Sequence, residues 1–297
     1  MDRMHSLLAW QSRDGHIQVL AGCLMGTHIH LILESLDGRL DVAMQRIEDT
    51  YARHYNRTRK HNGHVFKGRY FSREIFDPID LVITVDYIDW NPVSAQMCAR
   101  PEEYPHGTAR HYMGVAGLPW LAKDRLEALA CRLAGAQRYA PEFYPLIWQH
   151  AERAGARPLV ARAEGRPSVR IASIVRLATL GPLYVQEWLR KQMRSEEGRD
   201  TPCLLLPLGV VVAGVRALDL PHGEALTMQA GLLRTVAGLS TVEVGQALGI
   251  SQAAASRRAV AHRERMEQDA PYSMRVAGVV AGLVAERYGE LARRLGE

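Results

Sequence analysis

The stretch GCLMGTHIHLILES, Gly22–Ser35, contains most of a pair of β-like runs. HIQVLAGCLM precedes Gly26 and THIHLILES follows it, and both runs consist mainly of apolar and β-branched residues. Two such runs separated by a glycine are typical of adjacent strands joined by a turn. The sequence therefore predicts a β-hairpin with a tight turn at Met25–Thr27.

Two histidines, His28 and His30, interrupt the second run. Because side chains alternate across a strand, both imidazoles should project from one face while Ile29 and Leu31 project from the other. Two neutral imidazoles on one face can chelate a divalent metal ion. The same pair can also pack or form local hydrogen bonds, so it does not establish a metal site by itself.

The residues around the hairpin predict a small α+β domain. Residues 2–10 and 41–58 have the apolar spacing of helices, and GRYFSREIF at 68–76 has the pattern of a short strand. A further helix is expected from Pro78 to Trp90, because Pro92 should end it. Strands and helices that alternate in this way are typical of an antiparallel sheet covered by helices.

The helix before Pro92 supplies two more polar groups. Tyr87 and Asn91 are four residues apart, so they lie on the same helical face. An asparagine carbonyl can bind a metal ion, and a phenol can attack a phosphorus atom that a metal polarises. A core tyrosine and a helix-capping asparagine would explain the same residues without any chemistry.

A basic segment, RTRKHNGHVFKGRYFSR at Arg57–Arg73, contains no Asp or Glu and includes the aromatic residues Phe66, Tyr70 and Phe71. The formal net charge of the chain is +5. Cations suit phosphates and exposed rings suit unstacked bases, so this segment is a candidate surface for single-stranded nucleic acid. A solvated basic loop is the alternative.

The whole chain has 297 residues, of which 47% are hydrophobic and 23% charged, as in ordinary globular proteins. The cysteines are widely spaced and form no CxxC pair, which favours a reducing cytoplasm over a disulfide framework. The N-terminus lacks a signal-peptide pattern. The longest apolar stretch, residues 203–215, contains Pro207 and is interpreted as a buried helix, so no membrane partner is expected.

After Pro119 the sequence predicts helices and no further strand. We expect three regions: a first domain at 1–118, a helical extension and linker at 119–165, and an all-helical domain at 166–297.

Residues 239–265, LSTVEVGQALGISQAAASRRAVAHRER, predict a helix-turn-helix. Ser240 or Thr241 caps a first helix, Gly249 makes the turn, and Ser251 starts a second helix. The small Gly245 lets the two helices approach closely. The pattern places three side chains of the first helix inward: Val242, Val244 and Leu248.

The second of these helices would present its residues to a DNA major groove. The candidate contacts are Ser251, Gln252, Ala254, Ser256, Arg257 and Arg258. An ordinary helical hairpin with a cationic face is the alternative.

Four of these segments resemble one protein family when they are taken in order. HIH, NGHVFKGRY, YIDWNPVSA and EEYPHGTARHYMG follow one another as in the single-tyrosine HUH transposases, particularly the REP-associated tyrosine transposases of bacteria. The resemblance covers about residues 3–155. ALGISQAAASRR is similar to the replication-initiator or Trp-repressor-like modules that some of these transposases carry.

The resemblance implies a ferredoxin-like HUH domain over residues 1–118, followed by an all-α region with a helix-turn-helix. His28, His30 and Asn91 would hold Mg²⁺ or Mn²⁺, and Tyr87 would be the nucleophile. Members of the family act in DNA transposition: they cleave single-stranded DNA near hairpins of palindromic repeats and leave a 5′-phosphotyrosine. The resemblance implies phosphate contacts from three cations: Lys67, Arg69 and Arg73. A monomer associated with the nucleoid, with duplex DNA as a second partner, is also expected.

The chain departs from the family pattern at several points. Gly26-Thr27 stands where a Pro-Asn pair is usual, and Gly107-Thr108 stands where a serine pair is usual. Family members also carry a first strand before the helix that MHSLLAW matches, so the domain is expected to be truncated at its N-terminus. The alternative function is therefore a catalytically impaired, transposase-derived DNA-binding regulator. A purely structural helical protein would leave the ordered motifs unexplained.

Overall fold

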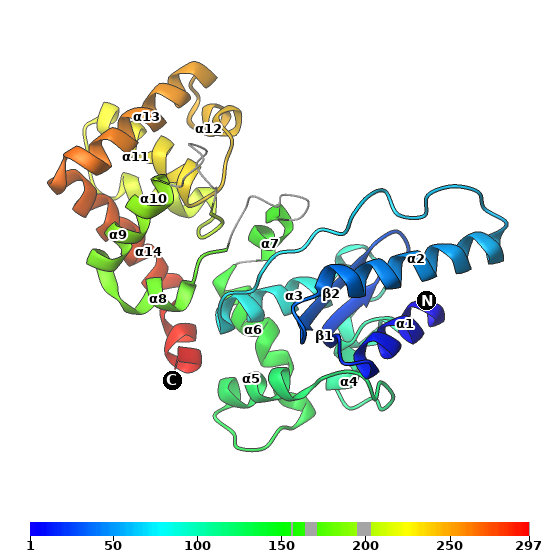
Figure 1. The fold of residues 1–297 in the computed structure, drawn as a ribbon. Helices are drawn as coiled ribbons and strands as arrows, with labels where there is room; N and C mark the ends of the chain where they lie inside the picture. Colours follow the sequence, from blue (N-terminus) through cyan, green and yellow to red (C-terminus); the bar gives the residue numbers. More distant parts are fainter. Residues whose placement is uncertain (156, 164–170, 195–202, 297) are drawn as a thin grey trace. The chain divides into compact units, whose positions relative to one another are not determined.

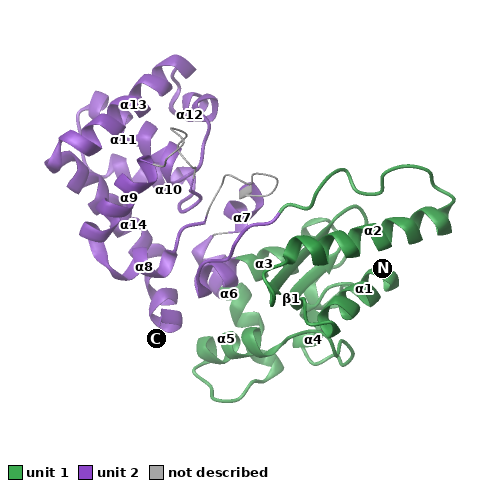
Figure 2. Ribbon diagram, in the orientation of Figure 1, with its two compact units in different colours: residues 1–71, 84–149 green, residues 72–83, 150–297 purple. Residues whose placement is uncertain are grey.

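The computed structural model describes residues 1–155, 157–163, 171–194 and 203–296. The chain forms two compact units (Figure 2). Unit 1 consists of Met1–Phe71 and Thr84–Gln149, and unit 2 consists of Ser72–Ile83 and His150–Glu297.

The sheet of unit 1 is an antiparallel hairpin of β1 (Ile17–Leu24) and β2 (Ile29–Ser35), as the sequence predicted (Figure 1). Its register pairs Cys23 with His30. The turn is closed by the Met25 N–H, which donates to the His28 carbonyl over 2.9 Å. Most of β1 is buried, whereas β2 is half-buried along most of its length.

The second edge of β1 is covered by the segment 104–122 rather than by another strand. The backbone of Thr108 donates to Gly22 and the backbone of Ala122 donates to Val19, each over 2.9 Å. Two buried tyrosine hydroxyls, of Tyr104 and Tyr112, also donate to β1 carbonyls. The polar backbone groups of this edge are therefore satisfied without a third strand.

The prediction of a strand at 68–76 is wrong, because the backbone there is irregular. A strand forms only by pairing with a neighbouring strand, and this segment pairs with neither β1 nor β2. The end of the segment is instead held by Asp80, whose carboxylate accepts from the Arg73 side chain and from the Phe76 N–H.

Two helices of unit 1 appear where they were predicted, and they contact each other: α1 (Asp2–Arg13) and α2 (Leu40–Arg59). The helix α3 (Pro78–Ser94) belongs to unit 2 up to Ile83 and to unit 1 from Thr84, and it continues past Trp90, so its predicted end is wrong. Pro92 is buried inside the helix. A proline costs one backbone hydrogen bond, and the burial of this face offsets that loss.

The rest of unit 1 is built from short helices. They are η1 (Pro101–Glu103), α4 (Ala109–Tyr112), α5 (Asp124–Ala134), η2 (Pro141–Phe143) and the first part of α6 (Pro145–Ala154). Unit 1 extends to Gln149, well beyond the expected boundary at residue 118, because Tyr144 and Trp148 are hydrogen-bonded to α3. The second expected boundary, at 165, lies outside the described residues.

Unit 2 is mainly helical in the residues that are described. Its helices are α7 (Arg157–Ala163), α8 (Ile174–Thr179), α9 (Gly181–Met193), α10 (Leu208–Arg216), α11 (His222–Thr235), α12 (Thr241–Leu248), α13 (Gln252–Gln268) and α14 (Ala270–Gly296). The long α14 packs against α8 and α9, and α11 packs against α13.

The apolar stretch 203–215 is buried in part as a helix and in part as extended chain. The helix α10 begins only after Pro207, whereas Cys203 and Leu205 donate backbone hydrogen bonds to Thr235 and Val236. No helix in the described part of the chain is long and apolar enough to cross a membrane. After Pro119, the described residues form no strand. The observed class is α+β, with one small antiparallel sheet.

Candidate functional site

Four predicted site residues lie together in unit 1, where the start of β2 meets the middle of α3. The rings of His28 and His30 are edge to face with centroids 4.8 Å apart. The ring of Tyr87 lies 5.6 Å from that of His30, and Asn91 Nδ2 lies 3.1 Å from His30 Nε2. Residues distant in the sequence thus form one cluster.

The geometry of Asn91 and His30 fits two ligands of a single metal ion. Adjacent ligand atoms about 2.1 Å from an octahedral ion are separated by about 3.0 Å. Rotating the Asn91 amide by about 180° about its Cβ–Cγ bond would bring its oxygen to the position that the nitrogen now occupies. Among the described residues no three His, Cys, Asp or Glu side chains form a metal-binding group. A metal in this cluster would therefore use two imidazoles and one amide.

The cluster is partly exposed to solvent. His28 is exposed, whereas His30, Tyr87 and Asn91 are half-buried. The Thr27 hydroxyl lies 3.1 Å from His28 Nδ1. This contact orients the ring, and it leaves Nε2 as the nitrogen that can bind a ligand.

Asp89 is a buried acid of the same helix that the sequence prediction did not single out. It lies between Tyr87 and Asn91 in the sequence but on the buried side of α3, where its Oδ2 accepts from the Tyr144 hydroxyl at 2.9 Å and from Trp148 Nε1 at 3.0 Å. Its Oδ1 has no hydrogen-bond partner among the described residues. Burial raises the pKa of this carboxyl to about 7. The signal available in the sequence was an acid flanked by apolar residues in a buried helix.

The three cations expected to contact phosphates are in two different environments. Lys67 and Arg69 are exposed. Arg73 instead places Nη1 2.7 Å from the fully buried Asp80 carboxylate, and its own side chain is only 10% exposed. Its position favours a structural role, because a phosphate contact would require it to leave a buried acid unpaired.

The residues Gly26, Thr27 and Thr108 make local contacts of their own. Thr108 anchors the covered edge of β1, since its hydroxyl accepts from the Gly22 N–H at 2.9 Å. Gly26 and Thr27 lie in the hairpin turn, where Thr27 contacts His28.

In unit 2, the predicted caps of α12 and α13 are present. Ser240 and Glu243 form a capping box, Gly249 ends α12 in the left-handed conformation, and the Ser251 side chain accepts from Ala254 N. Gly245 allows the close approach of the next segment, because a Cβ atom there would lie 2.8 Å from the Ile250 carbonyl oxygen. Val244 is buried as expected, but Val242 is 46% exposed, so its inward placement was wrong.

The residues proposed to enter a major groove differ in exposure. Ser251, Gln252, Ser256 and Arg257 are exposed, and Ala254 is half-buried. Arg258 donates from Nη1 to the Gly223 carbonyl at 2.8 Å and to the Thr227 hydroxyl at 3.1 Å. It therefore ties α13 to α11.

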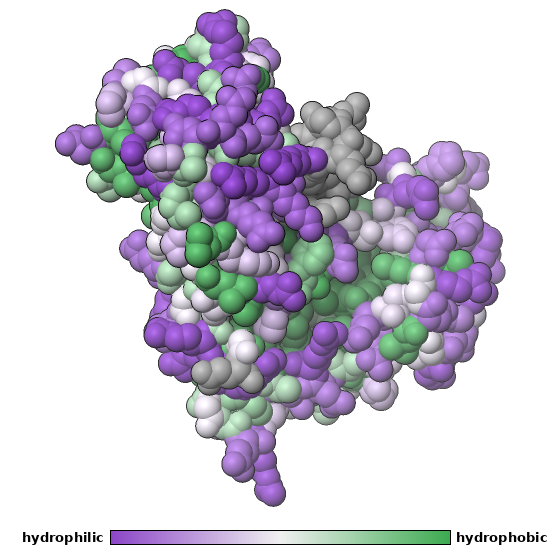
Figure 3. Space-filling view, turned by 60° about the vertical axis from the view of Figure 1, so that its left-hand side comes forward, coloured by the Kyte–Doolittle hydropathy of each residue, from purple (hydrophilic) through white to green (hydrophobic). Residues whose placement is uncertain are grey.

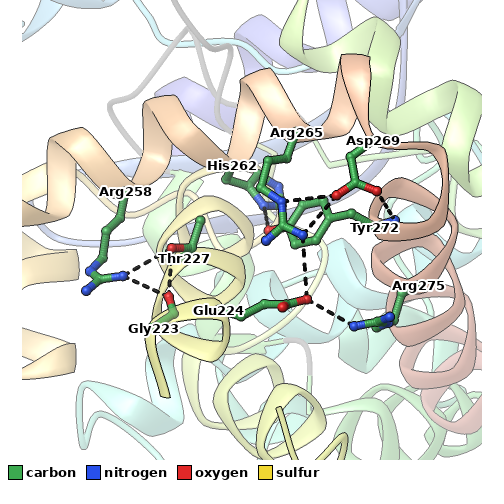
Figure 4. A network of polar contacts seen from close by, with 9 residues as sticks. All are labelled: Gly223, Glu224, Thr227, Arg258, His262, Arg265, Asp269, Tyr272 and Arg275. Carbon is green, nitrogen blue, oxygen red and sulfur yellow. Dashed lines mark hydrogen bonds and ion pairs between the residues drawn. The ribbon is translucent and has the colours of Figure 1, made fainter. Parts of the chain in front are cut away.

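The C-terminal half of α13 is held by a polar network (Figure 4). His262 Nδ1 lies 2.7 Å from the Tyr272 hydroxyl, and the Arg265 guanidinium stacks 3.8 Å from the centre of the Tyr272 ring. Arg265 also pairs with Asp269 and Glu224. Burial lowers the pKa of His262 to about 3, so its ring is neutral at ordinary pH. These contacts fix the direction of α13 relative to α11 and α14.

Comparison of the chain with protein-family models, with curated proteins and with solved structures found no match.

Proposed function

We propose that this protein is a metal-dependent, single-tyrosine endonuclease and strand transferase that acts on single-stranded DNA at palindromic hairpins, with the ferredoxin-like HUH arrangement as its catalytic domain. The observation that carries the proposal is the convergence of His28, His30, Asn91 and Tyr87 in one half-open cluster. Packing or helix capping alone does not require a tyrosine, an amide and two imidazoles from separate elements to meet.

In the proposed reaction, the Tyr87 hydroxyl oxygen attacks a DNA phosphorus atom. The tyrosine hydroxyl gives up its proton as its oxygen bonds to phosphorus. The bond from phosphorus to the 3′ oxygen breaks, and the 3′ oxygen takes up a proton and leaves as a hydroxyl, so one proton is lost and one is gained. His28, His30 and Asn91 would hold Mg²⁺ or Mn²⁺, which would polarise the phosphate. The phosphotyrosine conserves the bond energy for rejoining to another 3′-hydroxyl.

Further support comes from the surroundings of the cluster. Lys67 and Arg69 are exposed on the basic segment and suit a phosphate backbone. The Thr27 contact with His28 and the buried hydrogen bonds of Asp89 hold the ligands and α3 in place. Catalytic groups that neighbouring contacts hold in position lose less entropy when the substrate arrives.

The second candidate function is a DNA-binding regulator that uses unit 2, and it is favoured by the caps and the exposed polar face of α13. The surface over the upper part of the molecule, where Figure 1 has α12 and α13, is mainly hydrophilic (Figure 3). Ser251, Gln252, Ser256 and Arg257 would face a major groove, whereas Arg258 would support the helix. Such duplex binding is compatible with the enzyme and would bring a monomer to its target on the nucleoid.

The deciding experiment incubates the full chain with an internally labelled hairpin oligonucleotide and Mn²⁺. The expected result is a covalent protein–DNA band that survives denaturation, is absent from Tyr87→Phe and is lost with EDTA. Tyr184→Phe is the matched control, because it removes a tyrosine hydroxyl in α9, outside both the cluster and the basic segment, and should leave the band intact. If no band forms with wild type while labelled duplex is still retained, the enzyme proposal fails and the regulator proposal stands.

A further inference from the structure

The C-terminal half of α2 and the turn after it carry a row of neighbouring rings in unit 1. Tyr51 and Tyr55 have ring centroids 6.3 Å apart. Phe66 extends the row 5.9 Å from Tyr51, and His61 extends it 6.0 Å from Tyr55. Residues from the helix and from the basic segment thus form one aromatic surface, which we call the aromatic row.

Asn56 holds the end of this row in place. Its Nδ2 donates to the Gly63 carbonyl at 3.0 Å, and its Oδ1 lies 2.9 Å from His61 Nδ1. The helix ends at Lys60, which adopts the left-handed conformation with φ 51°. The turn and the His61 ring are therefore positioned before any ligand arrives, which reduces the entropy lost on binding.

The aromatic row is accessible and lies in a cationic stretch. Tyr55 is 36% exposed, His61 is exposed, and Tyr51 and Phe66 are half-buried. The sequence from Tyr51 to Arg73 contains no acidic residue. Five of its cations are exposed and, within the described part of the chain, make no ion pair: Arg57, Arg59, Lys60, Lys67 and Arg69. Such a surface attracts a polyanion that also offers flat apolar faces.

We propose that the aromatic row is a stacking platform for unpaired DNA bases, with phosphates held by the exposed cations beside it. The proposal rests on the proposed function for its choice of DNA as the strand. Duplex DNA does not fit as well, because its base faces are covered by neighbouring base pairs. An acidic peptide would satisfy the cations but would leave the rings without stacking partners. Single strands satisfy both features.

The test measures binding of a fluorescein-labelled oligothymidylate to the full chain by anisotropy. Tyr87→Phe is used as the background and EDTA is present, so no cleavage occurs. Tyr55→Leu keeps an apolar side chain but removes the ring, and we expect the Kd to rise between about 5-fold and about 150-fold. Tyr55→Phe keeps the ring and should bind within about twofold of the background protein.

The cation contribution is tested by salt dependence. Lys67→Gln and Arg69→Gln should each reduce the slope of log K against log salt by about 0.7 if each cation contacts one phosphate. Arg138→Gln makes the same change of charge at an exposed position of unit 1 outside the basic segment, and it should leave the slope unchanged.

The stacking proposal is overturned if Tyr55→Leu binds oligothymidylate as well as the background protein while its circular dichroism is unchanged. It is also overturned if an unlabelled duplex or poly-glutamate competes as well as an unlabelled single strand. Loss of the covalent band with retained Tyr55-dependent binding refutes only the proposed enzyme. A retained band with no Tyr55 effect refutes only the platform.

Discussion

Replacing Asp89 with asparagine should remove a specific pH dependence from the stability of unit 1. The carboxyl is fully buried, and its pKa is raised from 3.8 to about 7, chiefly by desolvation. The folded state therefore favours the protonated form. This contribution to stability is fully present below about pH 4 and is lost as the pH rises through 7.

The magnitude follows from the size of the pKa shift. Each unit of pKa corresponds to about 1.4 kcal/mol, so the ionised form of Asp89 is disfavoured by about 4 kcal/mol in the folded state. Between pH 5 and pH 8, wild type should lose about 3 kcal/mol relative to Asp89→Asn. The amide keeps an oxygen for Tyr144 and Trp148, and its NH₂ group takes the place of Oδ1, which accepts no hydrogen bond in the described residues. Any cost of leaving that NH₂ group unpaired, about 1–3 kcal/mol, does not vary with pH.

The assay is urea unfolding at pH 5, 6, 7 and 8, followed by tryptophan fluorescence. The signal reports mainly on unit 1, because most of the tryptophans belong to it: Trp10, Trp90, Trp120 and Trp148. The difference between the two proteins isolates Asp89 from the histidines that titrate in the same range. If the two stability curves run parallel from pH 5 to pH 8, Asp89 ionises normally in the folded protein and the reasoning is refuted.

Three further changes probe unit 2: the first two by urea unfolding and the third by circular dichroism at falling pH. Arg73→Ala should destabilise unit 2 by about 3–5 kcal/mol, because Asp80 is left buried without its cation. Asp80→Asn in the same chain should restore most of that stability. Equal stability of the single and double variants would contradict this. Gly245→Ala should cost about 1–3 kcal/mol, since its Cβ would lie 2.8 Å from the Ile250 carbonyl oxygen, and an unchanged midpoint would rule out that clash. Burial lowers the pKa of His262 to about 3, so its contribution to folding stability is present above pH 6.5 and falls as the pH drops towards 3. His262→Gln should make the loss of helical circular-dichroism signal with falling pH less steep. An equally steep loss would assign the acid sensitivity to other groups.

Features that depend on neighbouring residues were predictable from the sequence. The glycine at position 26 between two apolar runs predicted the hairpin, which is present. Ser240 predicted where α12 begins, and Gly249 and Ser251 predicted where it ends and where α13 begins. Caps and turns depend on interactions across only a few residues, so the sequence contains nearly all the information that they need.

Features that depend on distant partners were not predictable. A strand at 68–76 had suitable residues, but the fold gives it no pairing with β1 or β2. Pro92 was expected to end α3, yet the packing of that face maintains the helix. Arg73 had the charge for a phosphate contact, and only the fold showed that Asp80 holds it.

The candidate site shows the same division. The sequence alone singled out the candidate residues, because the spacing of His28 with His30 and of Tyr87 with Asn91 places each pair on one face of a strand or helix. Only the tertiary structure decided that the two pairs meet, with Asn91 Nδ2 3.1 Å from His30 Nε2. Periodicity orients side chains around one element, whereas the distance between two elements is set by the packing of the core between them.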